Sequence, residues 1–363
     1  MTRKQLKEEL LSFLEKGKVT RPRVVVMPDF FQDRLIDINL DVAGFSQVIA
    51  NVADRKGGSI DGIAQTDLRG GNAVNTASAL AALGAEVALI VCTSKAGFQQ
   101  LKFHLKRAHV DLSHVKILGE ASVTTALEFW SKHGKANVML RDLGALEEFG
   151  PADLSENDYA LIESADYVCI FNWAGTRKCG TQLAETVFGR VKAEGKGKTY
   201  YDTADPTPNK AKIPELIQKV LQTPKVDILS LNENEAIAYA SLFNEEVKGS
   251  KQNLSFEASA MKAARILAKH LPARIDLHTT AFAASITRQK ALVVPALNVH
   301  ALRATGAGDA WNAGNIMGDA AGVSDECRLA LANAVAAYYI ALPDGMHPTR
   351  KELIKFIKSI WQE

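Results

Sequence analysis

The stretch Arg303-Ala304-Thr305-Gly306-Ala307-Gly308-Asp309-Ala310-Trp311 is the most informative part of this sequence. Two glycines flank a small residue, and an aspartate follows at the start of a segment with helical character. A glycine-permitted turn that opens a helix leaves backbone N–H groups unpaired, and with the helix dipole these groups favour an anion. An aspartate beside such a site fits one task, which is to accept the proton of a hydroxyl that attacks a phosphoryl group.

The composition is that of a globular protein of 363 residues, 47% of them hydrophobic and 23% charged, with a net charge of +2. The near-balanced charge argues against a nucleic-acid partner. Four widely spaced cysteines without a CxxC pair predict reduced thiols and a cytoplasmic protein. The charged N-terminus lacks an apolar signal region, and no apolar run is long enough to span a bilayer, so we expect no membrane partner.

Short apolar runs alternate with helical segments along most of the chain. This alternation predicts an α/β fold with a doubly wound, mostly parallel sheet flanked by helices. Glycine-punctuated, partly alternating residues at about 34–68 predict a small β-rich subdomain that emerges from the main sheet, and further strands are predicted within 121–141. The apolar spacing over residues 3–16 predicts an amphipathic helix. We therefore expect a helical extension at 1–20 and one main domain at 21–363.

Two further stretches carry polar residues next to predicted strands or helices. Gly70-Gly71-Asn72-Ala73-Val74-Asn75 precedes an alanine-rich helix, and Asn232-Glu233-Asn234-Glu235 follows the predicted strand at 226–231. A structural explanation exists for each: a tight turn for the first, and a helix start with Asn232 as the N-cap for the second. Their joint occurrence with the stretch at 303–311 favours chemistry instead, because motifs are judged by their context.

The three stretches together resemble a known family. Ala304–Ala310 is similar to the C-terminal signature of the ribokinase-like, or PfkB, carbohydrate and nucleoside kinases. The segment 70–77 resembles their glycine-glycine signature, and Val226–Ala236 resembles the stretch that carries their Asn-x-x-Glu motif. The resemblance runs from about residue 23 to 360 in the order of the family. It implies a ribokinase-like fold, in which 34–68 and 121–141 join as one small β-sheet lid over the substrate.

The resemblance also implies roles for individual residues. Asp309 would be the general base, and the amides of Gly306, Ala307 and Gly308 would form an anion hole for the transferred phosphoryl group. Glu235 and Asn232 would hold Mg²⁺ through water. Residues expected at the nucleotide are Asn232, Thr279, Thr305 and Asn333. Residues expected at a sugar-like substrate are Asp33, Gly70, Gly71, Asn75 and Arg141; for Asp33, a solvated loop aspartate is an equal alternative.

The expected cofactors are Mg²⁺ and a nucleotide donor, with ATP ahead of ADP, and the family leaves room for a monovalent cation. The expected partners are the nucleotide and the sugar-like acceptor, and the lid is a candidate surface for a homodimer. The chain departs from the family at 91–97, where an expected aspartate is missing, and at 278–284, where expected glycines are missing. These departures leave the choice between ATP and ADP open.

Several basic residues lie close to the predicted site: Arg69, Lys95, Arg141, Arg177 and Lys178. If they converge, the acceptor already carries a phosphate or carboxylate group; scattered, solvated side chains are the alternative. The sequence thus favours a kinase of a sugar or sugar-like alcohol. Alternatives are a kinase of a phosphorylated sugar or a nucleoside, with ADP or ATP as donor, and a silent nucleotide- or sugar-binding regulator. A dinucleotide-dependent oxidoreductase is excluded because no glycine fingerprint occurs early in the chain.

Overall fold

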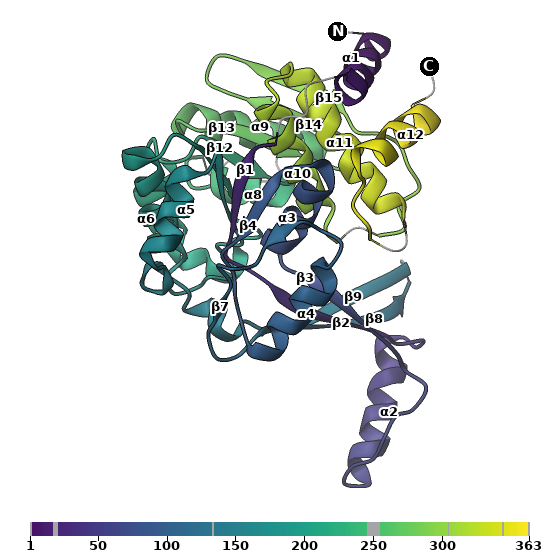
Figure 1. Cartoon of the computed structure of the whole chain (residues 1–363). Coiled ribbons are helices and arrows are strands. Elements are labelled where there is room, and N and C mark those ends of the chain that lie inside the picture. Colours follow the sequence, from purple (N-terminus) through teal and green to yellow (C-terminus); the bar gives the residue numbers. More distant parts are fainter. Residues whose placement is uncertain are drawn as a thin grey trace.

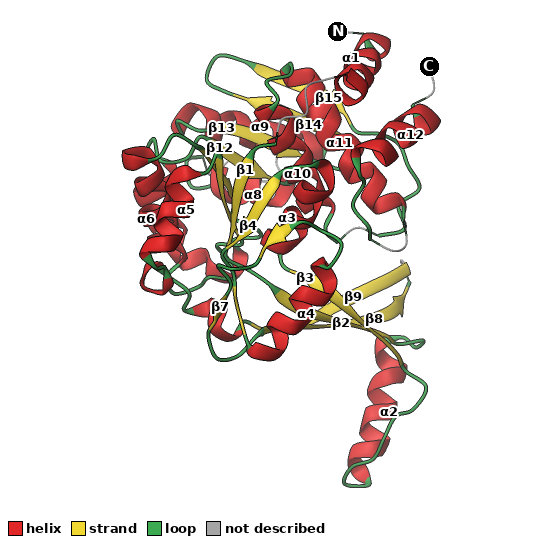
Figure 2. Ribbon diagram, viewed as in Figure 1, coloured by secondary structure: helices red, strands yellow, loops and turns green. Residues whose placement is uncertain are grey.

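The computed structural model describes residues 2–16, 21–132, 134–244, 255–303, 305–342 and 345–361. Its centre is a nine-stranded sheet in the order β15-β14-β13-β12-β11-β10-β1-β4-β6 (Figures 1 and 2). The strands are β1 Arg23–Met27, β4 Glu86–Leu89, β6 Val110–Asp111, β10 Tyr167–Phe171, β11 Lys198–Asp202, β12 Ile228–Leu231, β13 Arg274–His278, β14 Phe282–Ile286 and β15 Ala291–Pro295. Pairing is parallel from β6 to β13, and β14 and β15 are added antiparallel. This confirms the predicted mostly parallel sheet.

Helices cover both faces of this sheet, which explains why its central strands are almost continuously apolar. One buried cluster unites the sheet with α5 Glu156–Ser164, α6 Gly180–Glu194, α7 Ile213–Leu216, α8 Glu233–Ala240 and α9 Phe256–His270. The other cluster unites it with α1 Arg3–Lys16, α3 Asn72–Leu83, α4 Lys95–Leu105, α10 Ala307–Ala320, α11 Asp325–Ala341 and α12 Arg350–Ile360. No helix in the described parts of the chain is long and apolar enough to cross a membrane.

The helix expected over residues 3–16 is α1, and it packs on α11 and α12 through Leu6, Leu10 and Leu14 (Figure 1). The division into an extension at 1–20 and a domain at 21–363 stays a prediction, and residues 1 and 17–20 lie outside the described part of the chain.

A second sheet forms the lid. It has the order β3-β2-β8-β9, with β2 Phe31–Asp37, β3 Ala64–Gly70, β8 Ser122–Ser131 and β9 Gly134–Asp142. The β2–β8 pairing is parallel and the other two are antiparallel. The lid lies to one side of the main body in Figure 2. β5 Cys92–Thr93 and β7 Lys116–Ile117 pair in parallel and form a third, two-stranded sheet in the described part of the chain.

The β-rich reading of 34–68 is wrong over its middle part, where the chain forms helix α2, Val42–Asp54. Asp41 caps this helix by accepting a hydrogen bond from the Gly44 amide at 2.7 Å. Its apolar residues recur at the helical spacing of three and four, which outweighs their preference for strands. None of its residues is buried, and Figure 1 shows it projecting away from the lid.

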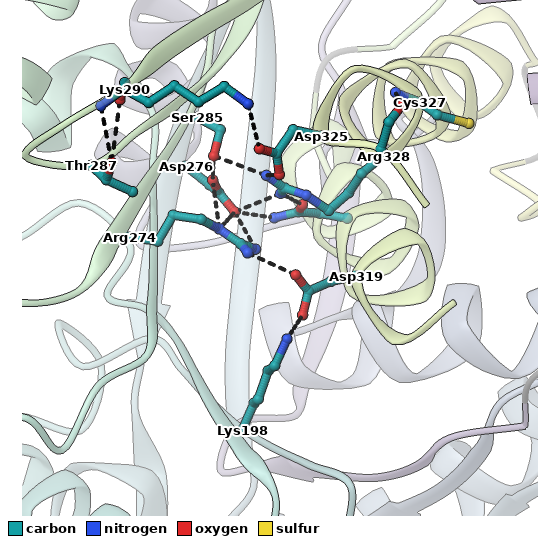
Figure 3. A network of polar contacts seen from close by, with 12 residues as sticks. Lys198, Arg274, Asp276, Ser285, Thr287, Lys290, Asp319, Asp325, Cys327 and Arg328 are labelled. Atoms are coloured by element: carbon teal, nitrogen blue, oxygen red, sulfur yellow. Dashed lines mark hydrogen bonds and ion pairs between the residues drawn. The ribbon is translucent and has the colours of Figure 1, made fainter. Parts of the chain in front are cut away.

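A buried polar network connects α10 and α11 to β13 and fixes the position of α10 (Figure 3). Arg328 of α11 is 1% exposed and donates to Asp276 of β13 at 2.8 Å. Asn315 of α10 donates to the same carboxylate at 2.9 Å and accepts from Arg328. Arg274 bridges Asp276 to Asp319 at the end of α10. Its two arginine neighbours hold the pKa of Asp276 well below its usual range despite burial, so the network is ionic.

Candidate active site

The site begins at the end of β1, where Asp29 is fully buried. Its carboxylate accepts hydrogen bonds from the backbone amides of Asn72 and Ala73 at 2.9 and 2.8 Å, so it caps the start of α3. Asn172 donates to it from the end of β10 at 2.9 Å. Gly71 has φ = 98°, and a Cβ there would lie 2.7 Å from the Asp29 carbonyl oxygen. A side chain is therefore excluded at Gly71, because the backbone of α3 has to approach β1 closely.

Asp309 lies in the first turn of α10, which faces α3 across the site. Its carboxylate accepts from the side-chain amides of Asn72 at 2.8 Å and Asn75 at 3.0 Å. The side chain is 5% exposed, and burial raises the pKa of Asp309 to about 8, against the opposing effect of the two amide donors. The structure thus brings together two of the three sequence motifs around one perturbed carboxyl group.

The three residues expected to form an anion hole surround the start of α10. Gly306 is left-handed, with φ = 87°, and precedes Ala307 and Gly308 in the first turn. Amides in the first turn of a helix have no partner within that helix, so they are available to an anion. A Cβ on Gly306 would lie 2.7 Å from the Tyr339 hydroxyl, so glycine is required there for space as well as for φ. Thr305 is exposed beside this turn; Ala304 lies outside the described residues.

Asn232 and Glu235 form a reciprocal cap at the start of α8. Asn232 Oδ1 accepts from the Glu235 amide at 3.0 Å, and the carboxylate accepts from Asn232 at 2.9 and 2.7 Å. The structural explanation, with Asn232 as N-cap, is therefore realised. Glu235 is 4% exposed, and burial with the nearby Asp202 raises its pKa well above the usual value. A cation bound near Glu235 and Asp202 would reduce the electrostatic repulsion between these carboxylates.

Two of the residues expected at the nucleotide have side chains engaged within the protein. The Thr279 hydroxyl donates to the Phe282 carbonyl at 2.8 Å and accepts from the amides of the β13–β14 turn. Asn333 accepts from the Trp311 indole at 2.9 Å and donates to the Pro295 carbonyl at 3.0 Å. Their contribution to a nucleotide site stays a prediction.

A cavity of about 700 Å³ is lined by lid residues on one side and by Asp29, Asn72 and Asn75 on the other. We call the group of Asp29, Asn72, Asn75 and Asp309 the floor. Residues of all four lid strands line the cavity, among them Asp33 of β2 and Arg141 of β9, and along β8 and β9 every second residue faces it. Burial raises the pKa of Asp33 to about 6, and Arg141, whose guanidinium lies 5.0 Å above the Phe31 ring, opposes that shift. A Cβ on Gly70 would lie 2.1 Å from the Asp33 carboxylate, so the absence of a side chain at Gly70 makes room for Asp33.

Only part of the expected basic set reaches this cavity. Arg69 and Arg141 line it, and Arg303, which had no predicted role, lines it as well. Arg177, Lys178 and Lys95 are not among the lining residues, and Lys178 pairs with Glu148. The lining also carries acidic groups, so the cavity has no uniform positive charge.

Three site residues were not singled out from the sequence: Asp29, Asn72 and Asn172. Asp29 follows the short apolar run at 24–27 after a single proline, and ligands in open α/β sheets collect at that edge, so its position was a usable signal. Asn72 lies within the glycine motif itself. Asn172 directly follows an apolar run, at 167–171, so the same signal was available, although its contact with Asp29 depends on the pairing of β1 with β10.

The chain belongs to the pfkB family of carbohydrate kinases, because the model of that family matches residues 42–351, most of its length. The family consists of phosphotransferases with an alcohol acceptor. A search of curated protein sequences finds no significant match.

Solved structures share the fold at low sequence identity. Ribokinase from Arabidopsis thaliana, complexed with ribose and ATP, has a TM-score of 0.71 at 19% identity, covering 93% of this chain and 99% of its own. Ribokinase from Cryptococcus neoformans var. grubii with ADP has 0.70 at 17%, with coverage of 93% and 99%. Adenosine kinase from Sinorhizobium meliloti has 0.65 at 17%, with coverage of 89% and 95%. The ribokinase-like fold with a small lid sheet is thereby confirmed.

Proposed function

We propose that this protein transfers the terminal phosphoryl group of a nucleotide, with ATP ahead of ADP, to a hydroxyl group of a sugar or sugar-like substrate. The single observation that carries the proposal is Asp309. A buried carboxyl group with a pKa of about 8 is held by Asn72 and Asn75 beside a glycine-opened helix start. A base whose pKa is close to the working pH is well matched to proton transfer.

In the proposed reaction the acceptor hydroxyl gives its proton to the Asp309 carboxylate while its oxygen bonds to the terminal phosphorus. The bond between that phosphorus and the leaving nucleotide oxygen breaks. The amides of Gly306, Ala307 and Gly308 are proposed to stabilise the charge on the transferred group, because preorganised donors need no rearrangement during the reaction. The lid excludes water, which would otherwise consume the nucleotide.

Mg²⁺ fits the chemistry of the acidic end of the site. Glu235, Asp202, Asp205 and Glu233 interact electrostatically there, and each of the other three raises the pKa of Glu235. When bound, the metal neutralises phosphate charge. Asn232 and Glu235 would hold it through its water shell, since Mg²⁺ keeps several waters. Thr279, Thr305 and Asn333 are proposed near the nucleotide, and a monovalent cation is proposed as an optional activator.

Asp33, Gly70, Gly71, Asn75 and Arg141 are proposed to surround the acceptor. The lining position of Asp33 supports this role, because a carboxylate can accept two hydroxyl hydrogen bonds. The relatives with solved structures include a ribokinase complexed with ribose and an adenosine kinase. A free sugar, a nucleoside and a phosphorylated sugar therefore all belong in the test.

The test is a matrix of free sugars, sugar phosphates and nucleosides against ATP and ADP, each with Mg²⁺. Product is measured as the phosphorylated acceptor by mass spectrometry, with Asp309→Asn as the inactive control. Transfer to at least one acceptor that is lost in Asp309→Asn supports the proposal. Ligand binding without transfer to any acceptor supports the rival reading, a silent nucleotide- or sugar-binding regulator.

A cytoplasmic location and a homodimer through the lid complete the proposal. The outer face of β9 exposes Val138 and Leu140 by 45% and 57%, and α2 exposes Val42 and Ile49 by 55% and 47%. Apolar groups gathered on one side of a sheet favour burial against a partner. Light scattering of wild type and of Leu140→Glu tests this, because a monomeric wild type contradicts the dimer.

A further inference from the structure

The strongest unexplained contact in the site involves Arg69, the penultimate residue of β3. Its Nε donates to Asn75 Oδ1 at 3.1 Å, and its Nη1 donates to the Ser78 hydroxyl at 2.9 Å. Both partners are on α3, so Arg69 connects the lid strand to the helix below the cavity. On the other side of Ser78, His347 lies 3.2 Å from the same hydroxyl.

This contact determines which way the Asn75 side chain points. A guanidinium group carries only hydrogen-bond donors, so the Asn75 atom that faces Arg69 has to be the amide oxygen. The amide nitrogen then points to the opposite side, where it donates to Asp309 Oδ2 at 3.0 Å. Without Arg69, a rotation of the amide by 180° would place an oxygen against the carboxylate.

We propose that Arg69 is a positioning residue for the phosphoryl transfer: it fixes the Asn75 amide and thereby holds the carboxylate of Asp309 in one orientation. The inference rests on the proposed role of Asp309 as the base. Asn72 holds the other carboxylate oxygen at 2.8 Å, so the two amides fix both oxygens of the carboxylate. Because Arg69 belongs to a lid strand, the lid is linked to Asp309 through a single intervening side chain, Asn75.

The charged groups that face Asp309 are few. Asp29 of the β1 end and Asp202 of the β11 end raise the pKa of Asp309, whereas Arg69 attracts its negative charge. His278, at the end of β13, packs against Trp311 and Gly308; burial lowers its pKa to about 4, so it is neutral at pH 7. Removing Arg69 takes away a positive charge near Asp309, and it also frees the Asn75 amide that donates to the Asp309 carboxylate. Both changes favour the protonated form of Asp309.

The test compares wild type with Arg69→Met, which keeps the aliphatic length but removes the charge and the donors. The carboxyl pKa of Asp309 is measured by ¹³C NMR of aspartate-labelled protein, with the signal assigned by its absence in Asp309→Asn. We expect the pKa to rise by about one unit in Arg69→Met. The acid limb of kcat/KM should move upward by the same amount.

Arg69→Lys keeps the positive charge but lacks the fixed fork of donors. We expect its Asp309 pKa to lie closer to wild type than that of Arg69→Met, while kcat falls. If Arg69→Met does not fold, the lysine variant still decides the matter, because a wild-type kcat in Arg69→Lys contradicts positioning. The exposed Arg190→Met serves as the matched control and should change neither quantity.

An Asp309 titration that is identical in wild type and Arg69→Met overturns the inference, even if turnover falls. The NMR readout does not depend on turnover. If Asp309→Asn is as active as wild type, the proposed base is wrong, whereas a pKa shift in Arg69→Met still establishes the link between the two side chains.

Discussion

The floor of the cavity, formed by Asp29, Asn72, Asn75 and Asp309, is held by buried hydrogen bonds, whereas β3 and α2 of the lid region are largely exposed. Asp29 and Asp309 are 0% and 5% exposed, and each accepts at least two hydrogen bonds from α3. In contrast, the first five residues of β3 are all exposed, and α2 has no buried residue. In the proposed function, the chemistry would thus depend on a rigid part of the molecule, and recognition of the acceptor would involve lid segments with few buried contacts.

The largest effect is expected on the floor, from Asp309→Asn. The amide cannot accept the proton, so kcat should fall on the order of 10²- to 10⁴-fold. The circular dichroism spectrum should stay that of wild type, because asparagine has the same shape. Asp111→Asn, an exposed change outside the cavity lining, is the control for replacing a carboxylate. A turnover of Asp309→Asn within a few-fold of wild type would contradict the proposed role of Asp309 as the general base.

Gly71→Ala should give the next largest effect, a loss of about 2 to 4 kcal/mol in the free energy of unfolding. The new Cβ meets the Asp29 carbonyl oxygen at 2.7 Å in a backbone with positive φ. Gly62→Ala in the lid segment separates the two causes. It also has positive φ (77°), but its Cβ would meet nothing within 4 Å, so we expect a loss of about 1 kcal/mol. Urea unfolding measures the free energy of unfolding of each variant. Equal losses in Gly71→Ala and Gly62→Ala would contradict the idea that the backbone around Gly71 is more closely packed.

Asp33→Asn tests the lid through pH. Burial raises the pKa of Asp33 to about 6, so between pH 4 and 6 the folded protein binds a proton that the unfolded chain has released. The contribution of Asp33 to the free energy of unfolding should therefore rise as pH falls through this window. The asparagine variant lacks this contribution, and the difference between the two proteins should change by about 2 kcal/mol from pH 7 to pH 4. Asp54→Asn, an exposed change on α2, is the control, and parallel curves for wild type and Asp33→Asn would contradict the shift.

The smallest effect on stability is expected on α2. Ile49 is 47% exposed, so Ile49→Ser should change the free energy of unfolding of the isolated chain by no more than about 0.5 kcal/mol. A larger loss measured at low protein concentration would mean that α2 packs against the chain more closely than its exposure indicates. If the loss appears only at high concentration, the helix contributes to association.

The same contrast explains what the sequence could predict. The residues at 303–311 and 70–75 are recognisable because the backbone conformation at some of these positions requires glycine. The positive φ angles of Gly71 and Gly306 confirm this requirement. Helix α2 was missed because its valines, isoleucine and phenylalanine also suit a strand, although Asp41 and the apolar spacing were visible signals. The position of Asn172 at a strand end was visible in the sequence, but its contact with Asp29 was not, since that contact depends on the pairing of β1 with β10.

The network of Asp276, Asn315 and Arg328 has a consequence for transferring this activity to another protein. Each of these groups is buried, and sliding α10 by one residue would leave a charge without its partner at a cost of several kcal/mol. The position of Asp309 along the helix is thus fixed by Asn315, six residues further along α10. A graft of residues 303–311 alone would therefore carry the motif without its placement, whereas a graft that includes Asn315 and its two ionic partners would keep Asp309 in the position that the proposed reaction needs.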